Sequence, residues 1–277
     1  MVKGSGVEFR FVRLVQSGAV AQLSFHRPDV LNAFNHDMVV ECLRAMDRLD
    51  PGTRVLVVRG AGDQAFATGA DIKELQGRTI WSEMEMGPRR ELAHRLQKAP
   101  FLTVAVVQGY AFGAGFEFAL ACHLRVLHRD ATLALPETRL GFLPGNGGTV
   151  RLTRLVGPGR ALRMILLGER IDADTAERWG IANWVFDAAE FDREVDGLVK
   201  RLVTLSPTAT RAAIDSVSHA MDTALEQAIE YEHRWFQICL ASPEKAEGVA
   251  AFLEKRTPQF EQVSPLPKSS TDSGASS

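Results

Sequence analysis

The distribution of hydrophobic residues along the chain first predicts an antiparallel hairpin and then a helix. Residues 8–26 alternate apolar and polar side chains and are interrupted by Ser17 and Gly18, a pattern typical of two strands joined by a tight turn. After Pro28 and two asparagines, apolar residues recur at helical spacing and predict a helix that ends near residues 50–52. These helical positions are Met38, Val39, Cys42, Leu43, Met46 and Leu49.

Two continuous hydrophobic runs, at residues 54–60 and 103–109, predict strands that are covered on both faces. Both runs are rich in β-branched residues, as expected for buried parallel strands. Between them a helix is expected to begin near Pro88, with Leu92 and Leu96 on one face. Strands that alternate with helices predict an α/β fold with a layered core.

The pattern becomes mostly helical after Gly148. A short apolar run at residues 182–186 interrupts it, and three helices are expected from Ser206 and Pro207 onward. Their apolar faces predict packing on the core or on another subunit. The apolar residues in question are Trp235, Phe236, Leu240, Phe252 and Leu253.

We therefore expect a core over residues 1–200 and a C-terminal helical region over residues 201–262. The last segment, residues 263–277, is rich in Ser, Pro and Gly. Such a composition offers too little apolar surface to offset the entropy of ordering the chain. A disordered tail is expected there.

The composition is that of a soluble globular protein. With 277 residues, 45% hydrophobic and 24% charged, the chain is long enough for one large domain or a core with an appendage. A formal net charge of −2 predicts neither nucleic-acid nor membrane binding. Cys42, Cys122 and Cys239 have no CxxC spacing, so neither disulfides nor a thiolate metal site are expected. No apolar run is long enough to span a bilayer and no secretory leader is recognisable, so a cytoplasmic location is expected.

Two glycine-rich turns are candidate anion sites. The first contains Gly69 after an apolar run, and the second is the segment 109–115. Glycine permits a tight turn, and the start of a following helix leaves N–H groups without partners. Two such turns that converge on one oxygen form an oxyanion hole. Neither the second turn, with Phe118 in place of the third glycine, nor the GNGG of residues 145–148 completes a nucleotide-binding motif.

Glu117 and Glu137 are the candidates for acid–base chemistry. A glutamate near a helix start is by itself more often a surface residue. Here Phe116 and Phe118 flank the first glutamate, and residues 135–136 before the second are Leu and Pro. Burial among such neighbours is expected to raise the pKa of both carboxyl groups. None of the seven histidines forms a zinc or Ser/His/Asp pattern, so they are interpreted as packing or surface residues.

Five segments in unbroken order carry a resemblance to a known family. They are LNAFN, FATGADIKEL, QGYAFGAGFEFALAC, LPETRLGFLPGNGGTVRLTRLVG and EGVAAFLEKRTPQF. Together they resemble the crotonase superfamily, the enoyl-CoA hydratase/isomerase family, over about residues 8–260. The resemblance implies a spiral of ββα turns with a C-terminal helical trimerisation region, assembled as a homotrimer or a dimer of trimers. It also implies an acyl-CoA thioester substrate, whose coenzyme A is part of the substrate, and neither a further cofactor nor a metal.

The resemblance also implies roles for particular residues. The oxyanion N–H groups fall on Ala70 and Ala114, and the catalytic carboxyl groups on Glu117 and Glu137. Substrate contacts fall on Ala70, Asp71, Ile72, Lys73 and Ala114. The implied reaction is syn addition of water to a trans-2-enoyl-CoA, or the reverse dehydration. An enoyl-CoA isomerase, another acyl-CoA lyase or hydrolase of the same superfamily, and a catalytically silent acyl-CoA-binding subunit remain alternatives. RNA binding is not expected, because no lysine-rich helix is present.

Residues 76–91 are the expected wall over the acyl group. Trp81, Met84 and Met86 are the candidates to line it. Ordinary loop packing accounts for the same residues equally well, so the length of the acyl group stays open.

Overall fold

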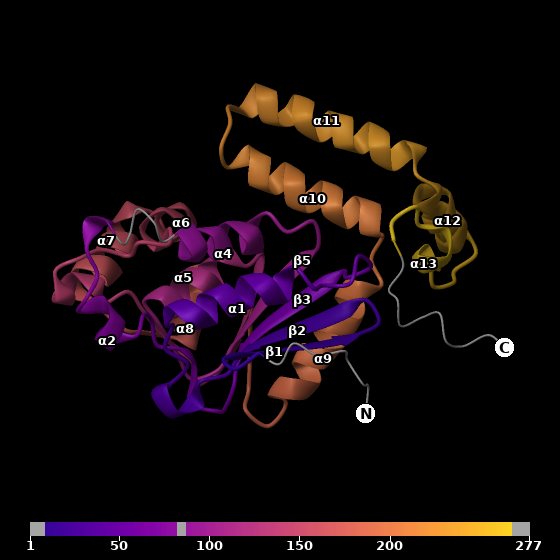
Figure 1. The fold of residues 1–277 in the computed structure, drawn as a ribbon. Helices are drawn as coiled ribbons and strands as arrows, with labels where there is room; N and C mark the ends of the chain where they lie inside the picture. Colours follow the sequence, from indigo (N-terminus) through magenta and orange to yellow (C-terminus); the bar gives the residue numbers. More distant parts are fainter. Residues whose placement is uncertain (1–8, 82–86, 268–277) are drawn as a thin grey trace.

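The computed structural model describes residues 9–81 and 87–267, which build two sheets surrounded by helices (Figure 1). The larger sheet has six strands in the order β1-β2-β3-β5-β7-β10, and the smaller has four in the order β4-β6-β8-β9. The larger contains β1 (Val12–Ser17), β2 (Val20–Phe25), β3 (Val55–Gly60), β5 (Leu102–Val107), β7 (Leu124–His128) and β10 (Trp184–Phe186). The smaller contains β4 (Ala65–Ala67), β6 (Tyr110–Phe112), β8 (Thr132–Ala134) and β9 (Ile171–Asp172).

The large sheet begins with the predicted antiparallel hairpin, β1 and β2, and continues with parallel strands. The strands expected at residues 54–60 and 103–109 are β3 and β5, which pair directly with Val57 opposite Val104. Parallel strands need crossover connections, and here helices provide most of them. The predicted α/β fold is confirmed.

Helices cover both faces of the large sheet, as Figure 1 shows. Alternate residues of β3 point to opposite sides: Leu56 packs in the cluster that includes Met38, whereas Val57 packs in the cluster that includes Val195. The first face is covered by α1 (His36–Met46), α4 (Gly87–Gln97) and α5 (Ala114–Ala121), and the second by α9 (Phe191–Val203). The predicted first helix ends at Met46, slightly earlier than expected.

Each of three long strands is followed by a short strand of the second sheet. β3 leads to β4, β5 to β6, and β7 to β8, and these short strands pair in parallel. This repeat is the expected spiral of ββα turns. It brings the segments after β4 and β6 to one edge, where α2 (Ile72–Leu75) and α5 begin.

The remaining helices lie around this core. They are η1 (Pro28–Val30), η2 (Glu137–Leu140), α6 (Gly148–Val156), α7 (Pro158–Leu167) and α8 (Ala173–Arg178). The C-terminal region contains α10 (Pro207–Ala220), α11 (Leu225–Ala241), α12 (Pro243–Leu253) and α13 (Phe260–Val263). Three helices were predicted there; the fourth, α13, is a single turn. Figure 1 shows α10 and α11 as an antiparallel pair above the core.

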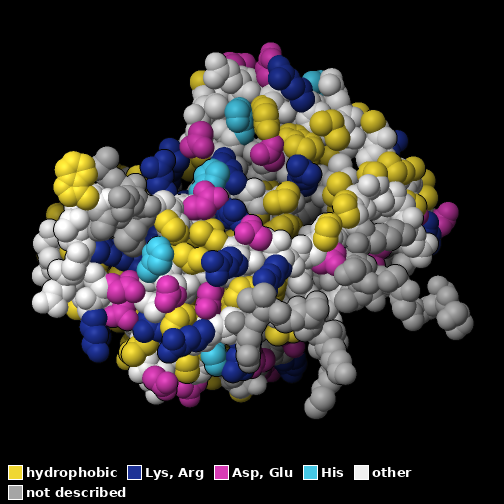
Figure 2. All heavy atoms as spheres, in the orientation of Figure 1, with side chains coloured by type: hydrophobic (Ala, Val, Ile, Leu, Met, Phe, Trp, Pro, Cys, Tyr) yellow, Lys and Arg dark blue, Asp and Glu magenta, His cyan; other side chains and the backbone are white. Residues whose placement is uncertain are grey.

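The C-terminal helices expose hydrophobic side chains, which gather over this region in Figure 2. The most exposed are Leu225, Phe252 and Leu253, at 73%, 83% and 74%. The boundaries of the core and helical region stay predictions. Of the predicted tail, residues 268–277 lie outside the described residues. Within the described part of the chain, no helix combines the length and apolar content needed to cross a membrane.

Candidate active site

The two glycine-rich turns contact each other through their backbones. Gly69 and Gly113 have φ angles of +102° and +50°, which disfavour residues with a side chain. A Cβ atom on Gly113 would lie 3.5 Å from the Cα of Gly69, and one on Gly69 would lie 3.7 Å from the N atom of Ala114. The residues that follow these glycines, Ala70 and Ala114, therefore lie beside the same junction.

Local structure leaves the N–H groups of Ala70 and Ala114 available. Ala70 pairs with Phe34 in an isolated parallel bridge, in which the Phe34 N–H donates to Gly69 O (2.8 Å) and the Asp71 N–H donates to Phe34 O (2.9 Å). In such a bridge the middle residue keeps its own N–H free of the pairing. Ala114 is the buried first residue of α5, where an N–H has no partner within the helix. The oxyanion role expected for these two N–H groups stays a prediction.

Glu117 is buried and its carboxylate accepts three hydrogen bonds. Its Oε1 accepts from the N–H groups of Asn146 (2.7 Å) and Gly148 (2.8 Å), and its Oε2 accepts from Asn146 Nδ2 (2.6 Å). Burial raises the pKa of Glu117, while these donors and the nearby Arg151 oppose that increase. A Cβ on Gly148 would lie 2.9 Å from Glu117 Oε1, so the carboxylate fits only beside glycine.

Glu137 lies on η2 with only 7% of its surface exposed, and its surroundings are very different. Its Oε2 is buried without a hydrogen-bond partner among the described residues. Burial raises the pKa of Glu137 to about 7, and the charge of Glu117 adds to the increase. A Cβ on Gly113 would lie 2.9 Å from Glu137 Oε1, which places this carboxyl group against the second turn. The predicted rise in pKa is thus confirmed for both glutamates.

The other predicted substrate contacts surround the first turn. The Asp71 carboxylate caps α2 by accepting from the Lys73 N–H (3.1 Å), and it pairs with Arg27 (3.1 Å). Ile72 and Lys73 are exposed on α2. Of the expected acyl wall, Trp81 is 72% exposed, whereas Met84 and Met86 lie outside the described residues.

Three residues at this site were not predicted from the sequence: Asn146, Arg151 and Gln97. Arg151 donates from Nη1 to the carbonyl oxygen of Asn146 (2.6 Å), and from Nε (3.0 Å) and Nη2 (2.7 Å) to Gln97 Oε1. The GNGG segment was interpreted as an incomplete phosphate loop and as part of the family resemblance, with no role for Asn146. Gln97 lies on α4, 54 positions before Arg151, so no local pattern connects them.

The histidines were predicted to be packing or surface residues, and the structure agrees with this at His123. Its ring forms hydrogen bonds with Thr103 and with the carbonyl oxygen of Gln97 (2.9 Å), and burial lowers its pKa. It is therefore a packing residue behind the site. Across residues 9–81 and 87–267, no three His, Cys, Asp or Glu side chains are grouped to hold a metal ion.

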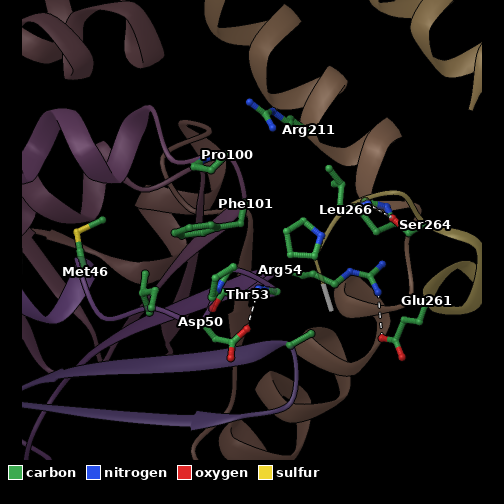
Figure 3. A pocket seen from close by; sticks show the side chains of 16 residues that line it. Met46, Asp50, Thr53, Arg54, Pro100, Phe101, Arg211, Glu261, Ser264 and Leu266 are labelled. Carbon is green, nitrogen blue, oxygen red and sulfur yellow. Dashed lines mark hydrogen bonds and ion pairs between the residues drawn. The ribbon is translucent and has the colours of Figure 1, made fainter. Parts of the chain in front are cut away.

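A cavity of about 380 Å³ lies elsewhere, between the core and the C-terminal helices (Figure 3). Its wall includes Arg54, which precedes β3 and pairs with Glu261 (3.0 Å), and Phe101, which precedes β5. These positions are at the amino ends of the parallel strands. The two turns follow the carboxyl ends, so this cavity is separate from the glutamates.

The chain is similar to known proteins in both sequence and fold. Residues 15–263 match the family model described as enoyl-CoA hydratase/isomerase. A crotonyl-CoA hydratase of Syntrophomonas wolfei is 36% identical over 244 residues, which cover 87% of this chain and 94% of that protein. A 2,3-dehydroadipyl-CoA hydratase of Escherichia coli is 34% identical, with coverages of 87% and 94%. The crystal structure of an enoyl-CoA hydratase from Bacillus anthracis superposes with a TM-score of 0.86 at 29% identity, covering 91% of this chain and 99% of the other.

Proposed function

Because this chain belongs to the enoyl-CoA hydratase/isomerase family, we propose that it adds water across the double bond of a trans-2-enoyl-CoA thioester, or catalyses the reverse dehydration. The observation that carries the proposal is a pair of buried glutamates that lie beside two contacting turns and differ in their hydrogen-bond partners. One carboxyl group is surrounded by donors, and the other has an oxygen without a partner. A syn addition needs one base and one acid on the same side of the substrate.

The two turns supply the oxyanion hole in this proposal. The N–H groups of Ala70 and Ala114 donate to the thioester oxygen, which becomes an enolate oxygen when water attacks Cβ. Donors fixed in place before the reaction stabilise this charge without reorganisation, and removal of one such donor costs roughly 10²–10³ in rate.

The two glutamates divide the proton transfers. Ionised Glu117 accepts a proton from the water whose oxygen forms the bond to Cβ. Protonated Glu137 donates its proton to Cα, so one water is added in total. Glu117 is then protonated and Glu137 ionised, and the protons exchange before the next turnover. Burial raises the pKa of Glu117, and its three donors oppose that rise by favouring the ionised form. A pKa of about 7 keeps a proton on much of Glu137 near neutral pH.

The substrate enters beside α2. Asp71, Ile72 and Lys73 lie directly after the first turn, where they contact the coenzyme A part of the thioester in this proposal. Coenzyme A belongs to the substrate, and the reaction uses no other cofactor. The proposal names a reaction rather than one acyl group, because the relatives are named for crotonyl and dehydroadipyl thioesters. The cytoplasm is the proposed location of the protein.

The C-terminal helices assemble the protein as a homotrimer or a dimer of trimers in this proposal. Exposed hydrophobic residues on one region of a protein mark an interaction surface. Phe236, Phe252 and Leu253 are 57%, 83% and 74% exposed on α11 and α12. Light scattering after size exclusion should give three or six times the mass of one chain.

The experiment that tests the function mixes purified protein with crotonyl-CoA and follows loss of the enoyl-thioester absorbance, with the product identified by mass. We expect a product heavier by one water. Ala70→Pro, which removes the N–H, should reduce the rate far more than Ala70→Ser, which keeps it. Double-bond migration in a 3-enoyl-CoA without hydration would favour an isomerase, and binding without turnover of either substrate would favour a silent subunit.

A further inference from the structure

The least expected contact at the site is the one between the side chain of Asn146 and Glu117. Asn146 reaches both carboxylate oxygens: its backbone N–H donates to Oε1 and its side-chain amide to Oε2. The two bonds, of 2.7 and 2.6 Å, fix the plane of the carboxylate as well as its position. A backbone donor alone leaves Oε2 free to rotate toward other partners.

Asn146 is itself held in place by Arg151. The Arg151 Nη1 donates to the carbonyl oxygen of Asn146, so the backbone of the residue that contacts Glu117 is itself held by α6. The Nε and Nη2 atoms of Arg151 both donate to Gln97 Oε1. The planar guanidinium group of arginine suits this arrangement, because its several N–H donors can bind the Asn146 carbonyl oxygen and the Gln97 side chain on α4 at the same time.

We propose that Asn146, held by Arg151, is a positioning residue that fixes Glu117 as the base of the hydration reaction. This inference rests on the proposed function, because it assigns a purpose to a contact with one of the two glutamates. Neither residue needs to touch the substrate.

The charges around Glu117 determine the direction of the expected effect. Arg151 on α6 favours the ionised carboxylate, and Glu137 on η2 is the acidic group that interacts with it. Removing the Asn146 amide takes away a donor to the charged form, which raises the pKa of Glu117. Activity that needs ionised Glu117 should then appear only at higher pH.

The test measures kcat and KM for crotonyl-CoA hydration against pH in the wild type and in Asn146→Ala. We expect a loss of roughly tenfold or more in kcat, little change in KM, and an acidic limb moved to higher pH by roughly one unit. The alkaline limb, which reports Glu137, should move less. An unchanged acidic limb in a folded Asn146→Ala protein overturns the proposal.

Two further variants separate positioning from simple structural support. Asn146→Asp keeps the shape but replaces the donor by a negative charge, so its acidic limb should move further than that of Asn146→Ala. Arg151→Lys keeps the charge but loses the fork, and it should lower kcat. Arg154→Lys is the matched control: Arg154 lies on the same helix and pairs with Asp222 (3.0 Å), away from Glu117. Equal effects of Arg151→Lys and Arg154→Lys would contradict the role of Arg151.

The same experiments distinguish failure of this inference from failure of the proposed function. If the wild type hydrates crotonyl-CoA and Asn146→Ala has the same pH profile, only the inference fails. If the wild type does not turn over, an NMR titration of ¹³C-labelled glutamate, assigned with Glu117→Gln, still reads the pKa of Glu117. A higher pKa in Asn146→Ala would support the positioning contact, and an equal pKa would overturn it.

Discussion

Glu117 and Glu137 are both buried in one site, yet they differ in the hydrogen bonds that their carboxyl groups accept. Glu117 lies on a regular helix and accepts three hydrogen bonds, two from Asn146 in the loop before α6 and one from Gly148, the first residue of α6. Glu137 lies on a short 3-10 helix with one oxygen buried and without a partner among the described residues. The difference shows that burial alone does not define a catalytic carboxyl group. The donors around a buried carboxyl group favour its charged form and so oppose the rise in pKa that burial causes.

The largest expected effect comes from neutralising either glutamate. Glu117→Gln and Glu137→Gln keep the shape of the side chain but remove the base and the acid, respectively. Each should lower kcat for crotonyl-CoA hydration by roughly 10²–10⁴. Full activity in either folded variant would show that the residue is not needed for hydration, and its proposed role as base or acid would be wrong.

A smaller loss is expected when the space beside each carboxyl group is filled. A methyl group on Gly148 would approach Glu117 Oε1 to 2.9 Å, and one on Gly113 would approach Glu137 Oε1 to 2.9 Å. Gly148→Ala should therefore lower kcat by about 10- to 100-fold, since hydrogen bonds to a charged group are disturbed. Gly113→Ala adds backbone strain, because its φ is +50°. Gly159→Ala, with open space around it, is the control and should stay within twofold or so of wild type.

The pH dependence of hydration should report the two environments separately. Glu137 must be protonated to act as the acid, and its pKa is about 7, so the rate should fall as pH rises through about 7. Glu117 must be ionised, so the rate should rise as pH increases through the raised pKa of Glu117. Stopped-flow rates across the pH range check both limbs. A flat profile above pH 7 would contradict the role of Glu137.

The smallest expected effect is on stability. The pKa of Glu137 is about 7 in the folded protein against 4.5 for a free glutamate, so the folded state keeps a proton that the unfolded chain has released. Raising the pH from 4.5 to 7 should therefore lower the free energy of unfolding through this group. Denaturant titrations of wild type and Glu137→Gln, compared over that window, measure the difference. The free energy of unfolding of wild type should increase relative to that of Glu137→Gln as pH falls from 7 to 4.5. A difference in that free energy that stays constant over this range would contradict the role of Glu137.

Much of the fold was predictable because it depends on local patterns. The hairpin around Gly18, the two buried strands and the helix α4 follow from hydrophobic periodicity and turn residues. One helix was missed although its signal is local: α9 spaces Phe191, Val195 and Leu198 at helical intervals. The extra turn of helix at α13 is too short to leave a periodic pattern.

The sequence by itself determined the two candidate glutamates, the two glycine-rich turns and the family resemblance, because these depend on residue type and order. Only the tertiary structure decided that Gly69 contacts Gly113, and that Asn146, Arg151 and Gln97 form one network behind Glu117. It also gave the two carboxyl groups their different hydrogen-bond partners. The physical reason is that a pKa depends on desolvation and on donors within a few ångströms, and folding brings those donors from residues far apart in the chain.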